Sequence, residues 1–260
     1  MKAKQPLITI IIATLNCADT IEHCLESIVS QTYPHKELIV MDGGSRDATV
    51  EILANRQNNI TYWKSKPDRG IYHAWNKALK HSHGEWICFL GADDYFWSKN
   101  ALTDLSPHLV KAADWKIKVV YGQVARVDRN GRILKLVGKP WKKIRWLMPH
   151  GMPLHLPHPG MMHHRSLFKR HGLFDETFMI AGDYEFLLRE LKDGSALFVK
   201  GLRTVGSQIG GIADVSRLKT NMETARAIKK NGLKRFSWVW TAVFARAFAR
   251  KLLYDFFYKI

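Results

Sequence analysis

The sequence is poor in cysteine and lacks the features that would mark a secreted or membrane-spanning chain. Its three cysteines, Cys17, Cys24 and Cys88, show no C-x-x-C spacing, so we expect a reducing compartment, no disulfide framework and no structural zinc site. The apolar run at residues 7–13 is followed by no cleavage-site pattern and predicts a buried strand rather than a signal peptide. Near the C-terminus the longest uncharged stretch is residues 236–245, whereas a transmembrane helix needs roughly 20 apolar residues.

Acidic residues are scarce, and their shortage is confined to one part of the chain. The 260 residues include 40 Lys and Arg against 23 Asp and Glu, a formal net charge of +17. Residues 1–100 hold 11 basic and 11 acidic residues, so residues 101–260 carry the whole excess. The length and the 46% hydrophobic fraction allow one large domain with a substantial core. A neutral half and a basic half suggest different partners, the basic half facing something anionic.

Apolar runs and helical patterns alternate along the first hundred residues. The expected strands cover residues 7–13, 37–41, 60–63 and 85–90. Asn16 or Asp19 is expected to cap the helix after the first strand, and Asp47 to begin the helix after the second. Four such alternations with short connections predict an α/β fold whose mainly parallel sheet has right-handed crossovers.

After residue 100 the pattern changes. Residues 118–124 and 133–137, joined by a D-R-N-G segment, predict a β-hairpin. A basic aromatic stretch, residues 139–146, precedes a loop rich in proline and histidine, residues 149–164. Because no repeat or low-complexity linker divides the chain, we expect one catalytic-type domain with a C-terminal helical tail.

Three polar clusters follow the ends of expected strands, where ligands bind in open α/β sheets. They are residues 14–16 (T-L-N), residues 42–45 (D-G-G-S) and the pair Asp93-Asp94. Neighbouring aspartates can cap a helix, but two close carboxylates raise each other's pKa unless a cation compensates them. Mg²⁺ or Mn²⁺ is the natural cation, since it binds through carboxylates and substrate phosphates. Asp42 either forms part of a strand-to-helix turn or accepts the imide N–H of a uracil or thymine ring.

In order along the chain, the segments ITIIIATLN, ELIVMDGGSRDAT, FLGADD, HPGMMHHRSLF and IAGDYEFLLRE resemble the family 2 glycosyltransferases with a GT-A fold. The resemblance covers roughly residues 6–212 and is closest to bacterial enzymes that build cell-surface polysaccharides and exopolysaccharides. It implies a Rossmann-like nucleotide-binding sheet flanked by helices. Residues 1–215 would form this domain, with the nucleotide-sugar half at about 1–100 and the acceptor half at about 101–215.

The resemblance also assigns residues to the donor and the metal. Thr14, Asn16 and Asp42 would surround the nucleotide base and ribose, and Arg69 would lie near the base or diphosphate. Asp93 would face ribose or metal, and Asp94 would coordinate Mg²⁺ or Mn²⁺. The chain departs from a strict D-x-D motif, because it reads Ala92-Asp93-Asp94 and lacks the first aspartate. More of the metal binding is therefore expected to fall on Asp94.

Asp183 matches the family's catalytic base. By its position alone it could equally be a helix cap, since Gly182-Asp183 opens an apolar helical pattern. A carboxylate at a helix N-terminus stays ionised, which suits a group that accepts a proton from an attacking sugar hydroxyl. Glu185 either shares that face of the helix or is solvated.

Four histidines lie in the proline-rich loop: His155, His158, His163 and His164. Their spacing fits no zinc template, so structural roles are favoured. By resemblance, His158 is placed just before the acceptor region, where it could orient the donor phosphate or the acceptor. Tyr72 and Trp75 suit packing or sugar stacking, and Gly210-Gly211-Ile212 matches a family loop near the diphosphate.

The sequence thus predicts a metal-dependent inverting glycosyltransferase of the hexosyltransferase type. Its donor would be a nucleoside-diphosphate sugar, preferably a UDP-sugar, and its acceptor a saccharide or polyprenyl-linked molecule. The basic aromatic tail, residues 216–260, either packs on the domain or a partner or, through residues 236–260, meets a membrane surface. We therefore expect the cytoplasm, at the inner face of the membrane. The alternatives are a nucleotidyltransferase and a non-enzymatic protein that binds nucleic acid or a membrane surface; the neutral N-terminal half argues against nucleic acid.

Overall fold

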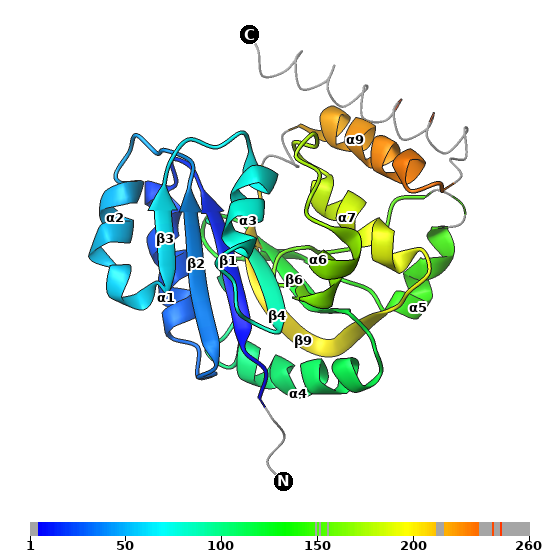
Figure 1. Cartoon of the computed structure of the whole chain (residues 1–260), viewed down its shortest axis with the longest axis horizontal. Coiled ribbons are helices and arrows are strands. Elements are labelled where there is room, and N and C mark those ends of the chain that lie inside the picture. The colour runs from blue at the N-terminus through cyan, green and yellow to red at the C-terminus, as the bar shows by residue number, and fades with distance from the viewer. Residues whose placement is uncertain are drawn as a thin grey trace.

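The structure, a computed structural model, describes residues 5–148, 150, 152–154, 156–211, 216–233, 241 and 245 (Figure 1). The strands are β1 (Ile8–Thr14), β2 (Lys36–Asp42), β3 (Tyr62–Ser65), β4 (Trp86–Gly91), β5 (Asp94–Phe96), β6 (Val119–Val127), β7 (Ile133–Val137), β8 (Met162–His164) and β9 (Ala196–Gln208). The helices are α1 (Ala18–Val29), α2 (Thr49–Asn55), α3 (Ile71–Leu79), α4 (Ala101–Asp114), α5 (Trp141–Ile144), α6 (Ser166–His171), α7 (Gly182–Leu191) and α9 (Arg217–Lys230). Two short 3-10 helices are η1 (Gln57–Asn59) and η2 (Arg145–Leu147).

The described strands form one mixed sheet in the order β3-β2-β1-β4-β8-β6-β9-β5, with β7 beside β6. Strands β1 to β4 run parallel, and β9 is parallel to β6. Strand β8 lies antiparallel between β4 and β6, while β5 and β7 are antiparallel to β9 and β6. This confirms the predicted α/β fold with a mainly parallel sheet flanked by helices (Figure 1). The hairpin predicted around residues 118–137 is also present, as β6 and β7.

The sheet has an apolar core on each face. Ile10 and Ile12 of β1 pack with α1 and α4, whereas Ile11 faces the core that contains α3, α7 and α9. All three side chains are completely buried, and burying each one stabilises the fold by roughly 2 kcal/mol. Burial on both faces explains why β1 reads as an unbroken apolar run rather than an alternating one.

The N-terminus of α1 is capped from another loop, so the expectation that Asn16 or Asp19 would cap it is wrong. Asn16 lies outside the helix with a φ of 51°. Asp47 accepts a hydrogen bond from the Ala18 N–H at 3.0 Å and a second one from the Thr49 N–H at 3.0 Å. One carboxylate therefore serves the starts of both α1 and α2, although α2 begins at Thr49 with Ala48 at its N-cap position rather than at Asp47.

The segment after β4 differs from the expected connection. Strand β4 ends at Gly91, and Asp94 begins β5, where it pairs with Ser207 of β9. The two aspartates therefore lead into a short antiparallel strand rather than capping a helix. Neither β5 nor the long strand β9 was predicted, because β9 pairs with strands that lie far from it in the sequence, β5 and β6.

Helix α9 packs against α7 (Figure 1), so residues 217–230 of the expected tail belong to the packed domain. Ala225, Ala227 and Ile228 are buried in the same core as Leu188 of α7. Residues 236–260, which carry the prediction of membrane contact, lie outside the described part except for Thr241 and Ala245. Among the described residues, no helix is both long enough and apolar enough to cross a membrane.

Candidate active site

Asp93 and Asp94 fold back over Gly91 at the end of β4. Asp94 is 5% exposed, accepts a hydrogen bond from the Gly91 N–H at 3.0 Å and is hydrogen-bonded to Ser207. A Cβ on Gly91 would lie 2.6 Å from Oδ1 of Asp93 and 3.0 Å from Oδ2 of Asp94. The two carboxylates thus occupy the space in which a side chain at position 91 would begin. Asp93 is only half-buried and is the more accessible of the two.

The pair has the electrostatic character of a cation site. Burial, together with the charge of Asp93, raises the pKa of Asp94 to about 7. Two carboxylates that oppose each other's ionisation in this way are relieved by a bound cation. Among the described residues, no group of three or more His, Cys, Asp and Glu side chains is placed to hold a metal. Two neighbouring carboxylates are oxygen ligands of the kind that Mg²⁺ or Mn²⁺ takes when water and substrate phosphates complete its shell.

The loops after β1 and β2 are tied to each other. The Asn16 N–H donates to Oγ of Ser45, and Oδ1 of Asn16 accepts from the Arg46 N–H, both at 2.8 Å. Asp42 is fully buried and accepts hydrogen bonds from the Gly44 and Ser45 N–H groups and from two serine hydroxyls. Its visible role is to shape this loop, so its contact with a nucleotide stays a prediction.

Two other residues assigned to the donor have different surroundings. Thr14 is 4% exposed, and its Oγ1 has no hydrogen-bond partner among the described residues. The Arg69 side chain is 72% exposed and pairs with Glu176 at 2.5 Å. Glu176 also accepts a hydrogen bond from Asn76 of α3 at 3.0 Å. Arg69 therefore links the start of α3 to the segment before α7, and donor binding by either residue stays a prediction.

Asp183 lies in the first turn of α7 with a side chain that is 23% exposed. Burial raises the pKa of its carboxyl group, although hydrogen bonds from Tyr184 and Tyr72 oppose the rise. The Tyr72 hydroxyl lies 3.1 Å from Oδ1 of Asp183 and 2.6 Å from the Ile180 carbonyl oxygen. A Cβ on Gly182 would come within 2.7 Å of the Tyr72 ring, so glycine is required for this contact.

His158 lies on the other side of Asp183. Its Nδ1 is 3.7 Å from Oδ2 of Asp183, and its ring stacks on Trp75 and Phe89. Burial lowers the pKa of His158 to about 3, so the ring is neutral at physiological pH. His163 is buried nearby, and its pKa is also lowered to about 3. These neutral rings form the wall behind Asp183, and His155 lies outside the described residues.

Strand β4 connects the two acidic sites. Phe89, near its end, contacts the His158 ring that lies beside Asp183. Two residues further on, the strand reaches Gly91 and the turn that carries Asp93 and Asp94. Asp183, far along the chain from Asp93 and Asp94, is thus linked to the same strand through His158 and Phe89.

Glu185 occupies neither of the positions expected for it. It is 1% exposed, forms a bidentate pair with Arg189 and lies 3.2 Å from Lys230 of α9. Residues two positions apart in an α-helix differ in direction by about 200°. The Glu185 side chain therefore points away from that of Asp183 and into the domain. Tyr72 and Trp75 are packing residues with 3% and 5% exposure, and the Tyr72 hydroxyl is a site contact that sequence reasoning missed. Ile212 lies outside the described residues, so the role of its loop stays a prediction.

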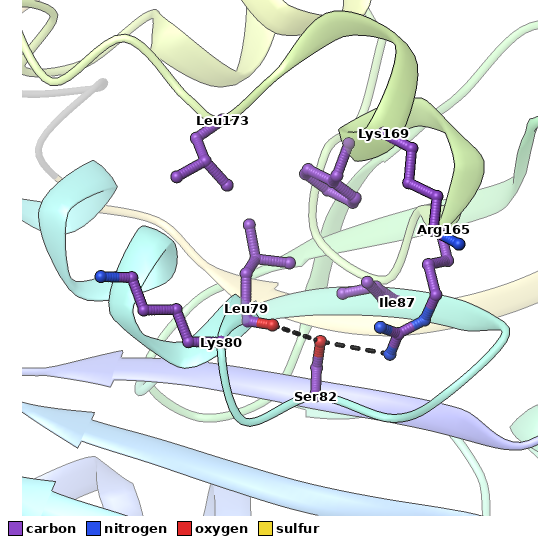
Figure 2. A pocket seen from close by; sticks show the side chains of 8 residues that line it. Leu79, Lys80, Ser82, Ile87, Arg165, Lys169 and Leu173 are labelled. Atoms are coloured by element: carbon purple, nitrogen blue, oxygen red, sulfur yellow. Dashed lines mark hydrogen bonds between the residues drawn. The ribbon is translucent and has the colours of Figure 1, made fainter.

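A pocket lies at the opposite end of β4, near the beginning of that strand (Figure 2). It is lined by Leu79, Lys80, Ser82, Ile87, Arg165, Phe168, Lys169 and Leu173. Figure 2 shows Arg165 directed toward Ser82, and its guanidinium donates to Ser82 at 3.3 Å and to the Gly84 carbonyl oxygen at 2.7 Å. None of the residues assigned to the active site lines this pocket.

A mixed α/β sheet with acidic side chains gathered after β4 and at the start of α7 defines an enzyme domain of the GT-A type. Solved GT-A glycosyltransferases show the same fold. TarS (residues 1–349) of S. aureus in complex with UDP-GlcNAc gives a TM-score of 0.66 at 19% identity, over 96% of this chain and 73% of that one. The mannosyltransferase PcManGT of Pyrobaculum calidifontis, in complex with GDP-Man and Mn²⁺, gives 0.66 at 20% identity, over 88% of this chain and 64% of that one.

The chain belongs to glycosyl transferase family 2, whose sequence model matches residues 9–173. A PGL/p-HBAD biosynthesis glycosyltransferase of Mycobacterium bovis is 29% identical over 187 residues, which are 71% of this chain and 69% of that protein. The chain spans 39% of the length of the longer TarS chain. Family membership supports a glycosyltransferase enzyme rather than either of the alternatives considered from the sequence.

Proposed function

We propose that this chain is a metal-dependent inverting glycosyltransferase that moves a sugar from a nucleoside-diphosphate sugar, a UDP-sugar in particular, to a saccharide or lipid-linked acceptor of surface polysaccharide biosynthesis. The observation that carries the proposal is that Asp93 and Asp94 follow the end of β4, while Asp183 lies beside the His158 ring that contacts Phe89 of the same strand. Two solved proteins of the same fold support a nucleotide-sugar donor, since one is in complex with UDP-GlcNAc and the other with GDP-Man and Mn²⁺.

Asp93 and Asp94 divide the metal site in this proposal. Asp93 provides the accessible carboxylate. Asp94 is held by hydrogen bonds with Gly91 and Ser207 and provides a second, buried carboxylate. Mg²⁺ or Mn²⁺ bound here would stabilise the charge of the diphosphate leaving group. We therefore propose that both carboxylates bind the metal, with Asp93 making the more exposed contact, in place of binding mainly by Asp94.

Asp183 is the proposed base. Its raised pKa makes it a stronger proton acceptor than an ordinary aspartate, and its partial exposure leaves an oxygen for an acceptor hydroxyl. The Tyr72 hydroxyl and the neutral His158 ring hold the carboxylate in one orientation. Asp183 would accept the proton of the acceptor hydroxyl as its oxygen attacks the anomeric carbon in line and the nucleoside diphosphate leaves. Inversion at that carbon is the outcome that the family resemblance implies.

The donor's nucleotide is proposed to lie against Thr14, Asn16, the loop shaped by Asp42, and Arg69. Thr14 ends β1 beside that loop, because the Gly43 N–H donates to the Thr14 carbonyl oxygen at 2.9 Å, and Asn16 follows two residues later. We place the enzyme in the cytoplasm at the inner face of the membrane, where a polyprenyl-linked acceptor would be available. Contact with that membrane through residues 236–260 belongs to the same proposal.

A donor screen tests the function. The protein is incubated with a panel of nucleotide sugars and Mn²⁺, with and without EDTA, and free nucleoside diphosphate is measured. Release with one donor that EDTA abolishes is expected, and proton NMR of the product should show an inverted anomeric centre. Absence of metal-dependent release with every donor, together with tight salt-sensitive DNA binding, would overturn the proposal.

A further inference from the structure

Residues 129–146, which comprise β7, α5 and most of η2, form a surface of unusual composition, called here the 129–146 surface. The segment contains seven basic residues and no Asp or Glu. All seven are exposed, and within the described part of the chain none of them forms a salt bridge. They are Arg129, Arg132, Lys135, Lys139, Lys142, Lys143 and Arg145.

Large apolar side chains are exposed among these charges. Ile133, Leu134 and Leu136 of β7 are 38%, 52% and 39% exposed, and Trp146 is 57% exposed. In the described structure β7 pairs with β6 alone, so its other edge is open. An open, apolar strand edge is a liability in water unless something covers it.

Helix α5 fixes the orientation of the neighbouring charges. Trp141 and Ile144 are each 4% exposed and anchor the helix in the core, which leaves Lys142 and Lys143 on the outside. The indole N–H of Trp146 donates to the Lys143 carbonyl oxygen at 3.0 Å. The only polar atom of that side chain is therefore satisfied, and its ring can leave water without breaking a hydrogen bond.

We propose that the 129–146 surface docks on a bilayer that contains anionic lipids. Basic side chains attract anionic headgroups, and apolar and tryptophan side chains among them enter the interfacial layer. A second copy of this surface would repel it through the same seven charges. A soluble polyanion would match the charges but leave Leu134, Leu136 and Trp146 in water. The docking rests on the proposed function only in that a lipid-linked acceptor would lie in the same bilayer.

Vesicle co-sedimentation of the full chain tests the docking without any turnover. Binding is expected to phosphatidylcholine vesicles that contain phosphatidylglycerol, and to weaken with salt and without the anionic lipid. Trp146→Ser should reduce binding at least fivefold, whereas Trp115→Ser, at an equally exposed tryptophan (55%) on α4's end, should not. The double variant Lys142→Gln, Lys143→Gln should lower vesicle binding on the order of fivefold for each charge removed. The control double variant Lys99→Gln, Lys116→Gln, at exposed sites elsewhere on the protein, should not lower it to this extent.

Two results would overturn the docking. One is equal binding of Trp146→Ser, Trp115→Ser and the parent protein. The other is absence of binding to anionic vesicles combined with a dimer that Trp146→Ser dissociates. A failed donor screen would leave the vesicle result unchanged, so the two proposals fail separately.

A second inference comes from α9, which lies outside the region matched by the family model. One buried carboxylate of this helix, Glu223, accepts hydrogen bonds from three successive N–H groups. They belong to Met179 at 3.0 Å, Ile180 at 2.7 Å and Ala181 at 2.9 Å. These residues immediately precede Gly182 and Asp183, so Glu223 fixes the backbone that carries the proposed base.

The same face of α9 continues this contact. Arg226 lies over the Phe178 ring at 3.7 Å and donates to Thr177 at 2.6 Å. Lys230 contacts Asp175 at 2.7 Å, one turn further along. Residues three, four and seven apart share a helix face, so α9 supports the segment from Asp175 to Ala181 along its length.

We infer that Glu223 is a positioning residue for Asp183. Its charged carboxylate holds three backbone groups that would otherwise be free to turn the start of α7. A displacement of about 1 Å at a reacting group can cost on the order of 100-fold in rate. The inference rests on the proposed role of Asp183, but the backbone contact can be measured without it.

Glu223→Gln and Glu223→Ala test the inference, with Met222→Ala as control because Met222 is the exposed neighbour (58%). Hydrogen exchange at Met179 to Ala181 should speed up in both Glu223 variants and not in the control. We expect kcat to fall 10- to 100-fold in Glu223→Ala and less in Glu223→Gln, with the donor KM unchanged. Unchanged kcat with faster exchange would show a purely structural contact and overturn the inference, as would unchanged exchange.

Discussion

Replacing Asp94 by asparagine should change how the stability of the protein depends on pH. Burial and the charge of Asp93 raise the pKa of Asp94 from its ordinary 3.8 to about 7. Between these two values the folded protein keeps a proton that the unfolded chain has released. The free energy of unfolding therefore falls by roughly 1.4 kcal/mol per pH unit as pH rises from about 4 to about 7. Above about pH 7 it no longer changes through this group.

Asparagine removes this titration, because the amide is neutral in both states. Between about pH 5 and about pH 7 the parent protein should lose roughly 2 to 3 kcal/mol relative to Asp94→Asn. Urea unfolding followed by circular dichroism, in EDTA, measures the difference. Asp93→Asn should move the pH window downward, since it removes the second cause of the shift, and Asp19→Asn, at an exposed position, serves as the charge control.

Mn²⁺ provides the complementary measurement. A cation favours the ionised carboxylate, so Mn²⁺ at about pH 7 should raise the melting temperature of the parent protein more than that of Asp94→Asn. A free-energy difference between the two proteins that stays constant from about pH 5 to about pH 7 would refute the reasoning. It would mean that Asp94 is not the buried, charge-opposed group that the structure shows.

Three further substitutions probe the site. Asp183→Asn should lower kcat at least 100-fold while donor binding persists, measured by calorimetry with the nucleotide; near-normal turnover would leave Asp183 only a helix cap. Glu185→Ala should destabilise the fold by about 3 kcal/mol because Arg189 loses its buried partner, and a denaturation midpoint equal to the parent's would contradict this. Gly182→Ala places a methyl group 2.7 Å from the Tyr72 ring and should cost about 1–3 kcal/mol and reduce kcat; unchanged kinetics would show that the Tyr72 contact is dispensable.

Local patterns predicted the first half of the fold well. The run of isoleucines in β1 and the alternating strands and helices follow from burial on both faces and from short connections. The hairpin of β6 and β7 was equally visible, since its turn residues lie within the loop itself. Strands β5 and β9 were not predicted, because their pairing depends on residues far apart in the chain.

The residues of the candidate site could be predicted from the sequence, but the burial and hydrogen-bond partners of each residue could not. The sequence identified Asp93, Asp94 and Asp183 as candidate metal-binding and catalytic residues, largely through family resemblance. It could not show that Asp94 is buried against Ser207 while Asp93 remains accessible, because that depends on the pairing of β5 with β9. The burial of Glu185 and its contact with Lys230 likewise depend on how α7 packs against α9.

The sequence by itself determined that this chain builds a mainly parallel α/β sheet with polar residues after its strands, since hydrophobic periodicity and turn chemistry act locally. It also carried, through its motifs, the resemblance to family 2 glycosyltransferases. Only the tertiary structure decided which carboxylates are exposed and which are buried, and that α9 holds the backbone before Asp183. Burial and partners arise from contacts between distant segments, and these set the pKa and orientation of each group.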